Sequence, residues 1–303
     1  MIYVTQGHEK GVGLEIFFKS FINLEGNNQE NFTLITFAET LKSNLESLSL
    51  KFKIDDNKLI LDHVQLKLIL LTNKNEPEST TALLFAINIC NENDILLTLP
   101  TSKDQILLNN KVLSGHTELF RSYYNQPDLP MTFLSHDSNF LLLTDHISLD
   151  KVLPTLSDKN FILSKIRLCI NNMPHDRNIR EVFFAGFNPH CGENGIIGTH
   201  DKIITNVLDI LKLEYPTIKF HPMMAADTIH FQIKDKSQLF IFGYHDQGLG
   251  IFKQRYGLSG INFTQGLPYK RVSVDHGTAF DLWGKNKANS IGMNFLLNEI
   301  KNW

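Results

Sequence analysis

Three histidines each follow a short apolar segment that has the composition of a buried β-strand. They are His146 after residues 140–144, His190 after residues 182–185 and His245 after residues 239–242. In an open parallel sheet the ligand crevice lies beyond the carboxyl ends of the strands, so we expect the three imidazoles to converge on one site. Neutral imidazoles are common ligands of divalent cations, and three of them leave coordination positions free for a substrate. Because their spacing matches no short metal motif, ordinary hydrogen-bonding roles in loops remain the alternative.

Groups that suit a phosphate accompany the histidines. Residues 186–198 form a glycine-rich connection between a strand and a helix, where close backbone and free N–H groups could receive an anion. Thr117 stands in a polar turn that opens another helix, and Lys253, Asn262 and Arg271 follow downstream. Arg can donate two charge-assisted hydrogen bonds to a phosphate, whereas Lys acts as a point charge. An ordinary connection, an N-cap and solvated basic side chains are the respective alternatives.

The elements that must position these residues alternate along the chain. Short apolar runs rich in Val, Ile, Leu and Phe are separated by longer segments of helical period, a pattern typical of parallel strands joined by covering helices. We therefore predict an α/β fold with two subdomains flanking a cleft. The first subdomain is expected to comprise residues 1–105 and about 285–303, and the second residues 106–284. The closing segment, residues 293–300, is predicted to be a helix that packs on the first half.

The composition of the 303-residue chain excludes several classes of protein. Lys and Arg number 29 against 32 Asp and Glu, so no sequence-wide field would attract nucleic acid or an anionic membrane. The longest apolar runs are far shorter than the roughly 18–20 residues that span a bilayer. The first residues lack the regions of a secretory signal, and the three cysteines form neither an even set nor a C-x-x-C pair. We therefore expect a cytoplasmic protein that binds neither nucleic acid nor membrane.

Six ordered sequence blocks carry a resemblance to one enzyme family. The blocks are SGHTE at 114–118, GFNPHCGE at 186–193, ADT at 226–228, YHDQGL at 244–249, NFTQGLP at 262–268 and RVSVDHGTA at 271–279. In type and order they resemble the signature of the 4-hydroxythreonine-4-phosphate dehydrogenase family. The first hundred residues are similar to the family only at scattered positions. There, His8-Glu9-Lys10 stands where the family usually has an acidic residue followed by small ones.

The resemblance implies a fold like that of isocitrate and isopropylmalate dehydrogenases and a role in pyridoxal 5'-phosphate (vitamin B6) biosynthesis. Members of this family are homodimers that use NAD or NADP and a divalent metal ion such as zinc, magnesium or cobalt. They oxidise and decarboxylate 4-phosphooxy-L-threonine to 3-amino-2-oxopropyl phosphate. The family binds its cofactor without the G-x-G-x-x-G fingerprint, which this sequence also lacks.

Carried over position by position, the resemblance makes His146, His190 and His245 the metal ligands. This is the trio that placement at strand ends already indicated. In the family the third histidine comes from the other subunit, so the metal site is expected to be shared in a homodimer.

The resemblance also implies contacts for the substrate and the cofactor. The substrate contacts are His116, Thr117, Lys253, Asn262 and Arg271. Lys253 is in addition expected to act in catalysis as an acid, a base or an electrostatic aid. The turn formed by Asp275, His276 and Gly277 is predicted to touch the cofactor.

Three other functions remain open. A paralogue would oxidise another hydroxy acid phosphate, such as threonate phosphate, or an aromatic cis-diol carboxylate; the basic residues favour a phosphate. A metal-dependent phosphoester hydrolase would use the same histidines with water, and a catalytically silent binding protein would bind metal and phosphate without turnover. Formation of NADH distinguishes a dehydrogenase from the last two.

Overall fold

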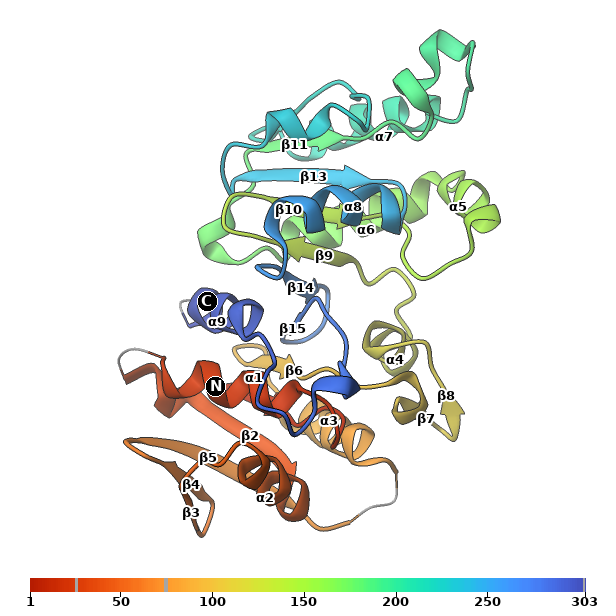
Figure 1. Cartoon of the computed structure of the whole chain (residues 1–303). Coiled ribbons are helices and arrows are strands. Elements are labelled where there is room, and N and C mark those ends of the chain that lie inside the picture. The colour runs from red at the N-terminus through yellow and green to blue at the C-terminus, as the bar shows by residue number, and fades with distance from the viewer. Residues whose placement is uncertain (25–26, 74–75, 302) are drawn as a thin grey trace. The chain divides into compact units, whose positions relative to one another are not determined.

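The computed structural model describes residues 1–24, 27–73, 76–301 and 303, and the contacts within it divide the chain into two units. The first unit comprises Met1–Gln126, Leu258–Ile261 and Leu267–Asn302, and the second comprises Pro127–Gly257, Asn262–Gly266 and Trp303. Each unit combines strands with helices, which confirms the predicted α/β class (Figure 1). No helix in these described ranges is long and apolar enough to cross a bilayer.

The first unit is built on a mostly parallel sheet. Its strands are β1 (Ile2–Thr5), β2 (Phe32–Phe37), β3 (Phe52–Asp55), β4 (Lys58–Leu61), β5 (Val64–Leu71), β6 (Ile95–Thr98) and β15 (Lys270–Val274), with a separate hairpin of β7 (Leu107–Leu108) and β8 (Lys111–Val112). The helices are α1 (Gly13–Ile22), α2 (Ala38–Ser47), α3 (Glu78–Ile89), α4 (His116–Tyr123) and α9 (Ile291–Ile300).

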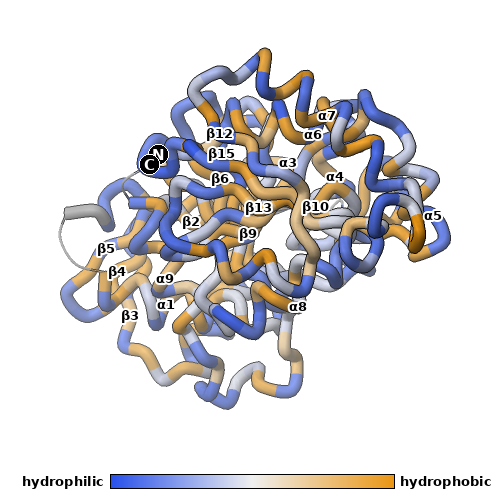
Figure 2. The backbone as a smooth tube through the Cα atoms, turned by 90° about the horizontal axis from the view of Figure 1, so that it is seen from above, coloured by the Kyte–Doolittle hydropathy of each residue, from blue (hydrophilic) through white to orange (hydrophobic). Residues whose placement is uncertain are grey.

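The strand order in the first unit is β15-β6-β1-β2-β5-β4-β3. The strands from β15 to β5 run parallel to one another, and β4 and β3 add an antiparallel edge. Strands that are covered on both faces lack polar alternation, which is why every residue of β2 and β6 is buried. Figure 2 accordingly shows β6 mainly in hydrophobic colours.

The second unit contains its own run of parallel strands. Its strands are β9 (Met131–Leu134), β10 (Asn139–Leu142), β11 (Glu181–Phe184), β12 (Lys219–Phe220), β13 (Gln238–Phe242) and β14 (Ile261–Thr264, whose first residue belongs to the first unit). The helices are α5 (Leu149–Leu156), α6 (Lys159–Asn171), α7 (Lys202–Glu214) and α8 (His245–Tyr256). The order is β12-β11-β13-β10-β9-β14, and β12, β11, β13 and β10 are parallel.

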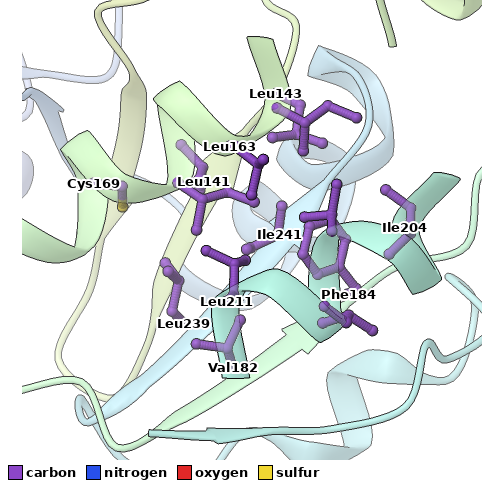
Figure 3. Close-up of a cluster of buried hydrophobic side chains, with 14 of the residues drawn as sticks. Leu141, Leu143, Leu163, Cys169, Val182, Phe184, Ile204, Leu211, Leu239 and Ile241 are labelled. Atoms are coloured by element: carbon purple, nitrogen blue, oxygen red, sulfur yellow. The ribbon is translucent and has the colours of Figure 1, made fainter. Parts of the chain in front are cut away.

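Alternate residues of three strands in the second unit point to one core. Leu141 and Leu143 of the β10 segment, Val182 and Phe184 of β11, and Leu239 and Ile241 of β13 meet apolar side chains of α6 and α7 (Figure 3). Such a core fixes the strand register, because a shift by one residue would turn every apolar side chain to the other face. The strand register therefore fixes the position along the sheet at which each following loop begins.

The boundaries of the units differ from those expected from the sequence. The first unit extends to Gln126 rather than to about residue 105, and the chain returns to it from Leu267 rather than from about residue 285. Pairing explains the difference, because β15 lies parallel beside β6 and α4 contacts the β7–β8 hairpin. The predicted closing helix is present as α9 and packs on α1, as expected. Asn302, which falls in the predicted first subdomain, lies outside the described residues.

Candidate functional site

The three strands that precede the candidate metal ligands are neighbours in the second unit. β11 pairs in parallel with β13, and β13 pairs in parallel with β10, so their carboxyl ends lie at the same edge. The segments that follow β10 and β13 remain hydrogen-bonded beyond Leu142 and Phe242. The Thr144 amide and hydroxyl both donate to the Gly243 carbonyl, at 3.1 and 2.7 Å. His146 and His245 each stand two residues beyond this joined pair.

His146 and His245 come together within one chain, as their placement at strand ends predicted, whereas the resemblance implied that His245 comes from the other subunit. Their ring centres are 5.7 Å apart, and both line an open pocket of about 360 Å³ with Asp145, Tyr244 and Asp246. Two imidazoles bound to one tetrahedral cation through bonds of roughly 2.0–2.1 Å have ring centres on the order of 5 Å apart. The pair therefore fits a shared divalent cation.

The second ring nitrogen of His245 already has a partner. Asp246 Oδ1 lies 2.6 Å from Nδ1 of His245, which leaves Nε2 available for a metal ion. A carboxylate on the far nitrogen of a ligand histidine fixes the tautomer and raises the basicity of the ligand. Sequence reasoning gave Asp246 no role, although its position directly after His245 was a usable signal.

His190 does not join this pair within one chain. In the part of the chain that the structure describes, no three His, Cys, Asp or Glu side chains are placed to hold a metal ion together. His190 lies in the 3₁₀ segment Pro189–Gly195, where the backbone of His190, Cys191 and the next three residues has positive φ angles. Left-handed backbone costs roughly 1–2 kcal/mol for each residue that carries a Cβ, so neighbouring contacts must hold this loop.

Asp201 supplies such contacts to the glycine-rich loop. Its carboxylate accepts from the Phe187 amide at 2.6 Å and from the Asn188 side-chain amide at 2.6 Å. Asp201 is 3% exposed and stands at the N-cap of α7, although its side chain accepts no hydrogen bond from that helix. The Phe187 and Asn188 amides are thus engaged within the protein, and an anion site at this helix start stays a prediction.

Three of the predicted substrate contacts lie in the first unit. His116 is the first residue of α4, and the next residue, Thr117, is buried. Arg271 is a buried residue of β15. Arg271 Nη2 donates to Thr98 Oγ1 at 2.6 Å, and the guanidinium lies over the Phe120 ring at 5.5 Å. This contact brings α4 and β15 together.

Burial dominates the electrostatics of this group. It lowers the pKa of Arg271 to about 9, so the guanidinium remains protonated at neutral pH. Burial and, after it, the Arg271 charge hold the pKa of His116 well below its usual range. The structure therefore combines a fixed positive charge with a neutral imidazole, a combination that suits an oxyanion.

The other two predicted substrate contacts belong to the second unit. Lys253 lies on α8, two turns after His245, which is about 12 Å along the helix axis. Asn262 lies on β14, and its Oδ1 is buried without a hydrogen-bond partner among the described residues. Each side chain is half-buried, so neither is a fully solvated surface group.

The predicted cofactor turn directly follows β15 in the first unit. The loops after β1 and β15 meet there: Thr278 O accepts from the Val12 amide at 2.9 Å, and His8 packs its ring against Phe280 with centres 4.7 Å apart. Two polar atoms near these strand ends, His276 Nε2 and Ser102 Oγ, are buried without hydrogen-bond partners among the described residues. Buried polar groups without partners at the carboxyl edge of parallel strands fit a ligand site there.

Comparison with known proteins assigns the family. The family described as pyridoxal phosphate biosynthetic protein PdxA matches residues 22–295. The chain belongs to the PdxA family. This confirms the resemblance carried by the six sequence blocks.

Curated relatives of this PdxA-family chain have two kinds of name. It is 30% identical to a 4-hydroxythreonine-4-phosphate dehydrogenase of Sulfurimonas denitrificans, over 99% of this chain and 95% of the relative. It is 28% identical to a putative D-threonate 4-phosphate dehydrogenase of Oceanobacillus iheyensis, over 94% and 92%. Both names denote dehydrogenases of phosphorylated hydroxy acids.

Solved structures confirm the predicted fold class. A 4-hydroxythreonine-4-phosphate dehydrogenase from Klebsiella pneumoniae matches with a TM-score of 0.77 and 24% identity, over 100% of this chain and 99% of the other. An isocitrate dehydrogenase from Methylococcus capsulatus matches with a TM-score of 0.51 and 13% identity, over 99% and 84%. The fold of the PdxA-family chain is thus of the isocitrate dehydrogenase type.

Proposed function

We propose that this PdxA-family protein oxidises 4-phosphooxy-L-threonine with NAD or NADP and decarboxylates it to 3-amino-2-oxopropyl phosphate, for pyridoxal 5'-phosphate biosynthesis. The observation that carries the proposal is the His146–His245 pair, whose separation suits one divalent cation at the carboxyl edge of parallel strands. The family match and the name of the Sulfurimonas relative support the reaction.

The side chains of the chain itself would bind and orient the substrate. Arg271 would hold the phosphate by charge-assisted hydrogen bonds, and Thr117 at the start of α4 would add another. His116, kept neutral, would donate from one ring nitrogen and accept at the other. Asn262 Oδ1 would accept from the substrate, and Lys253 Nζ would hold or deliver a proton as carbon dioxide leaves.

Two groups that the family uses fit residues of this chain. A zinc, magnesium or cobalt ion would make the substrate alcohol more acidic and stabilise developing negative charge, and NAD would accept the hydride. His146 and His245 would hold the ion together with His190. Asp275, His276 and Gly277 would contact the cofactor, and the orphaned Nε2 of His276 supports that assignment.

A homodimer would complete the metal site. Because His146 and His245 meet within one chain and His190 does not join them, a second copy would supply His190, and not His245 as the resemblance implies. Several large apolar side chains of the second unit are mostly exposed, among them Leu149 at 72%, Ile196 at 82% and Phe231 at 75%. Exposed side chains of this size are suited to burial against a second copy. A cytoplasmic location is part of the same proposal, and three free cysteines suit it.

The direct test is NADH formation by the purified protein with 4-phosphooxy-L-threonine, after addition of a divalent metal and after treatment with EDTA. We expect a rise in NADH absorbance that depends on the metal. Phosphate release without NADH would instead support a hydrolase. Metal and phosphate binding without turnover would identify a binding protein.

The ligand assignment has its own test in His190→Ala. We expect this variant to lose stoichiometric metal and NADH formation while its circular dichroism and oligomeric state stay those of the wild type. Exposed His136, which belongs to the same unit, provides the control substitution His136→Ala. A His190→Ala protein with full metal stoichiometry would contradict the three-histidine site.

Oxidation of D-threonate 4-phosphate is a second candidate function. It is favoured by the similarity to the Oceanobacillus iheyensis relative over nearly the whole of both chains. Both substrates would use the same phosphate and metal groups, so their kcat/KM values in one assay decide between them. A larger value for threonate phosphate would move the protein to that reaction and leave the site assignments unchanged.

A further inference from the structure

A buried ion pair lies directly behind the candidate metal ligands. Asp145 Oδ2 is 3.5 Å from Lys165 Nζ, and the two side chains are only 3% and 2% exposed. Lys165 belongs to α6, and its ammonium lies 5.1 Å from the ring centre of Phe161 one turn earlier on that helix. Asp145 precedes His146 and lines the same pocket. Neither charged residue has a part in the proposed chemistry.

The energetics of such a pair favour a role beyond stability. Removing two charges from water costs several kcal/mol for each ion, and replacing a buried pair by apolar side chains is often neutral or stabilising. A pair kept at this depth is therefore better explained by the geometry that it imposes. Here the geometry concerns the loop between β10 and α5, which carries His146.

The Asp145 carboxylate fixes this loop at two points. One oxygen faces Lys165, while the other accepts a hydrogen bond from the His146 amide at 3.0 Å. On the preceding side, Thr144 is bonded to Gly243, two residues before His245. The backbone of His146 is thus held against α6 through Asp145 and against the start of the His245 loop through Thr144.

We propose that the Asp145–Lys165 pair is a positioning device that holds His146 at the separation from His245 needed to bind one metal ion. The inference rests on the proposed function, because it assumes that the two histidines are ligands. It assigns no contact with metal or substrate to Asp145 or Lys165. Their effect passes through the His146 backbone.

The decisive variant removes both charges and keeps the volume, Asp145→Val with Lys165→Met. Removing one partner of a buried ion pair is by itself strongly destabilising, so single substitutions do not separate positioning from stability. The double variant should unfold in urea, without metal, close to the wild-type midpoint. Its affinity for Co²⁺, measured by calorimetry, should fall about tenfold or more, the usual cost of losing a group that orients a ligand. Its visible Co²⁺ spectrum should change as well.

The matched control is Arg167→Met on the same helix. Arg167 forms an ion pair with Glu214 of α7 on the exposed side, at 2.5 Å, and does not involve the His146 loop. This variant should bind Co²⁺ as the wild type does. A double variant with wild-type stability, Co²⁺ affinity and spectrum would overturn the positioning role. Co²⁺ binding that is absent from the wild type, or unaffected by His146→Ala, would instead overturn the metal site on which the inference rests.

Discussion

The two regions that carry candidate site residues place charges of opposite sign beside their histidines. In the first unit His116 lies within the field of the buried Arg271 guanidinium. In the second unit Nδ1 of His245 lies 2.6 Å from Oδ1 of the Asp246 carboxylate. The same side chain thus stands in a cationic setting in one unit and in an anionic setting in the other. If the proposed roles are right, neighbouring charge rather than residue type separates an oxyanion contact from a metal ligand.

The strongest test of the cationic setting is Arg271→Met. A methionine preserves much of the volume but removes the charge that would pair with the phosphate. Loss of one partner of a buried, hydrogen-bonded charge pair costs about 2–5 kcal/mol, so we expect kcat/KM for the phosphorylated substrate to fall by roughly 100-fold. Metal stoichiometry should not change, because the metal ligands belong to the other unit.

Arg271→Lys sharpens the same test. It keeps a positive charge but not the planar group that donates to Thr98 and would donate to the phosphate in parallel. We expect an activity between those of the wild type and Arg271→Met. Equal activity of the methionine and wild-type proteins would remove Arg271 from the substrate site.

A smaller effect is expected from the anionic setting in Asp246→Asn. The amide keeps the shape of the side chain, but it weakens the hold on the His245 ring that sets the tautomer. Loss of such an outer partner weakens metal binding by roughly 10–100-fold, and the exposed Asp246 should give a value near the lower limit. Calorimetric titration with Co²⁺ measures it. An unchanged dissociation constant would show that the contact does not tune the ligand.

The sequence was sufficient to place the candidate ligands at one edge. Apolar runs before His146 and His245 predict buried parallel strands, and parallel strands bring their carboxyl ends together. The sequence was insufficient for the loop around His190, because its left-handed backbone is accompanied by contacts with Asp201, which no local motif indicates. The glycines and Asn194 indicate tolerance of positive φ, but tolerance does not specify where the loop points.

Non-local pairing limited the prediction of the units in a similar way. β15 follows most of the second unit in the sequence but pairs with β6 of the first unit. The local sequence pattern of β15 does not predict which strand it pairs with. The result moved Arg271 and the turn at Asp275 from the predicted second subdomain into the first unit. His116 moved with them, because α4 also belongs there. Assigning a residue to a unit thus required the strand partners, which its position along the chain does not give.

The smallest expected effect concerns the pH dependence of stability in the cationic setting. An unfolded histidine titrates near pH 6.5, whereas burial, followed by Arg271, holds the pKa of folded His116 well below this value. Below about pH 6.5 the unfolded chain therefore binds a proton that the folded chain does not bind, so His116 lowers stability as the pH falls. His116→Gln lacks this term. Between about pH 6.5 and 5 the urea midpoint of the variant should fall less steeply with decreasing pH than that of the wild type. Above pH 7 the difference between the two midpoints should be constant. Parallel curves over the whole range would show that His116 is not held neutral.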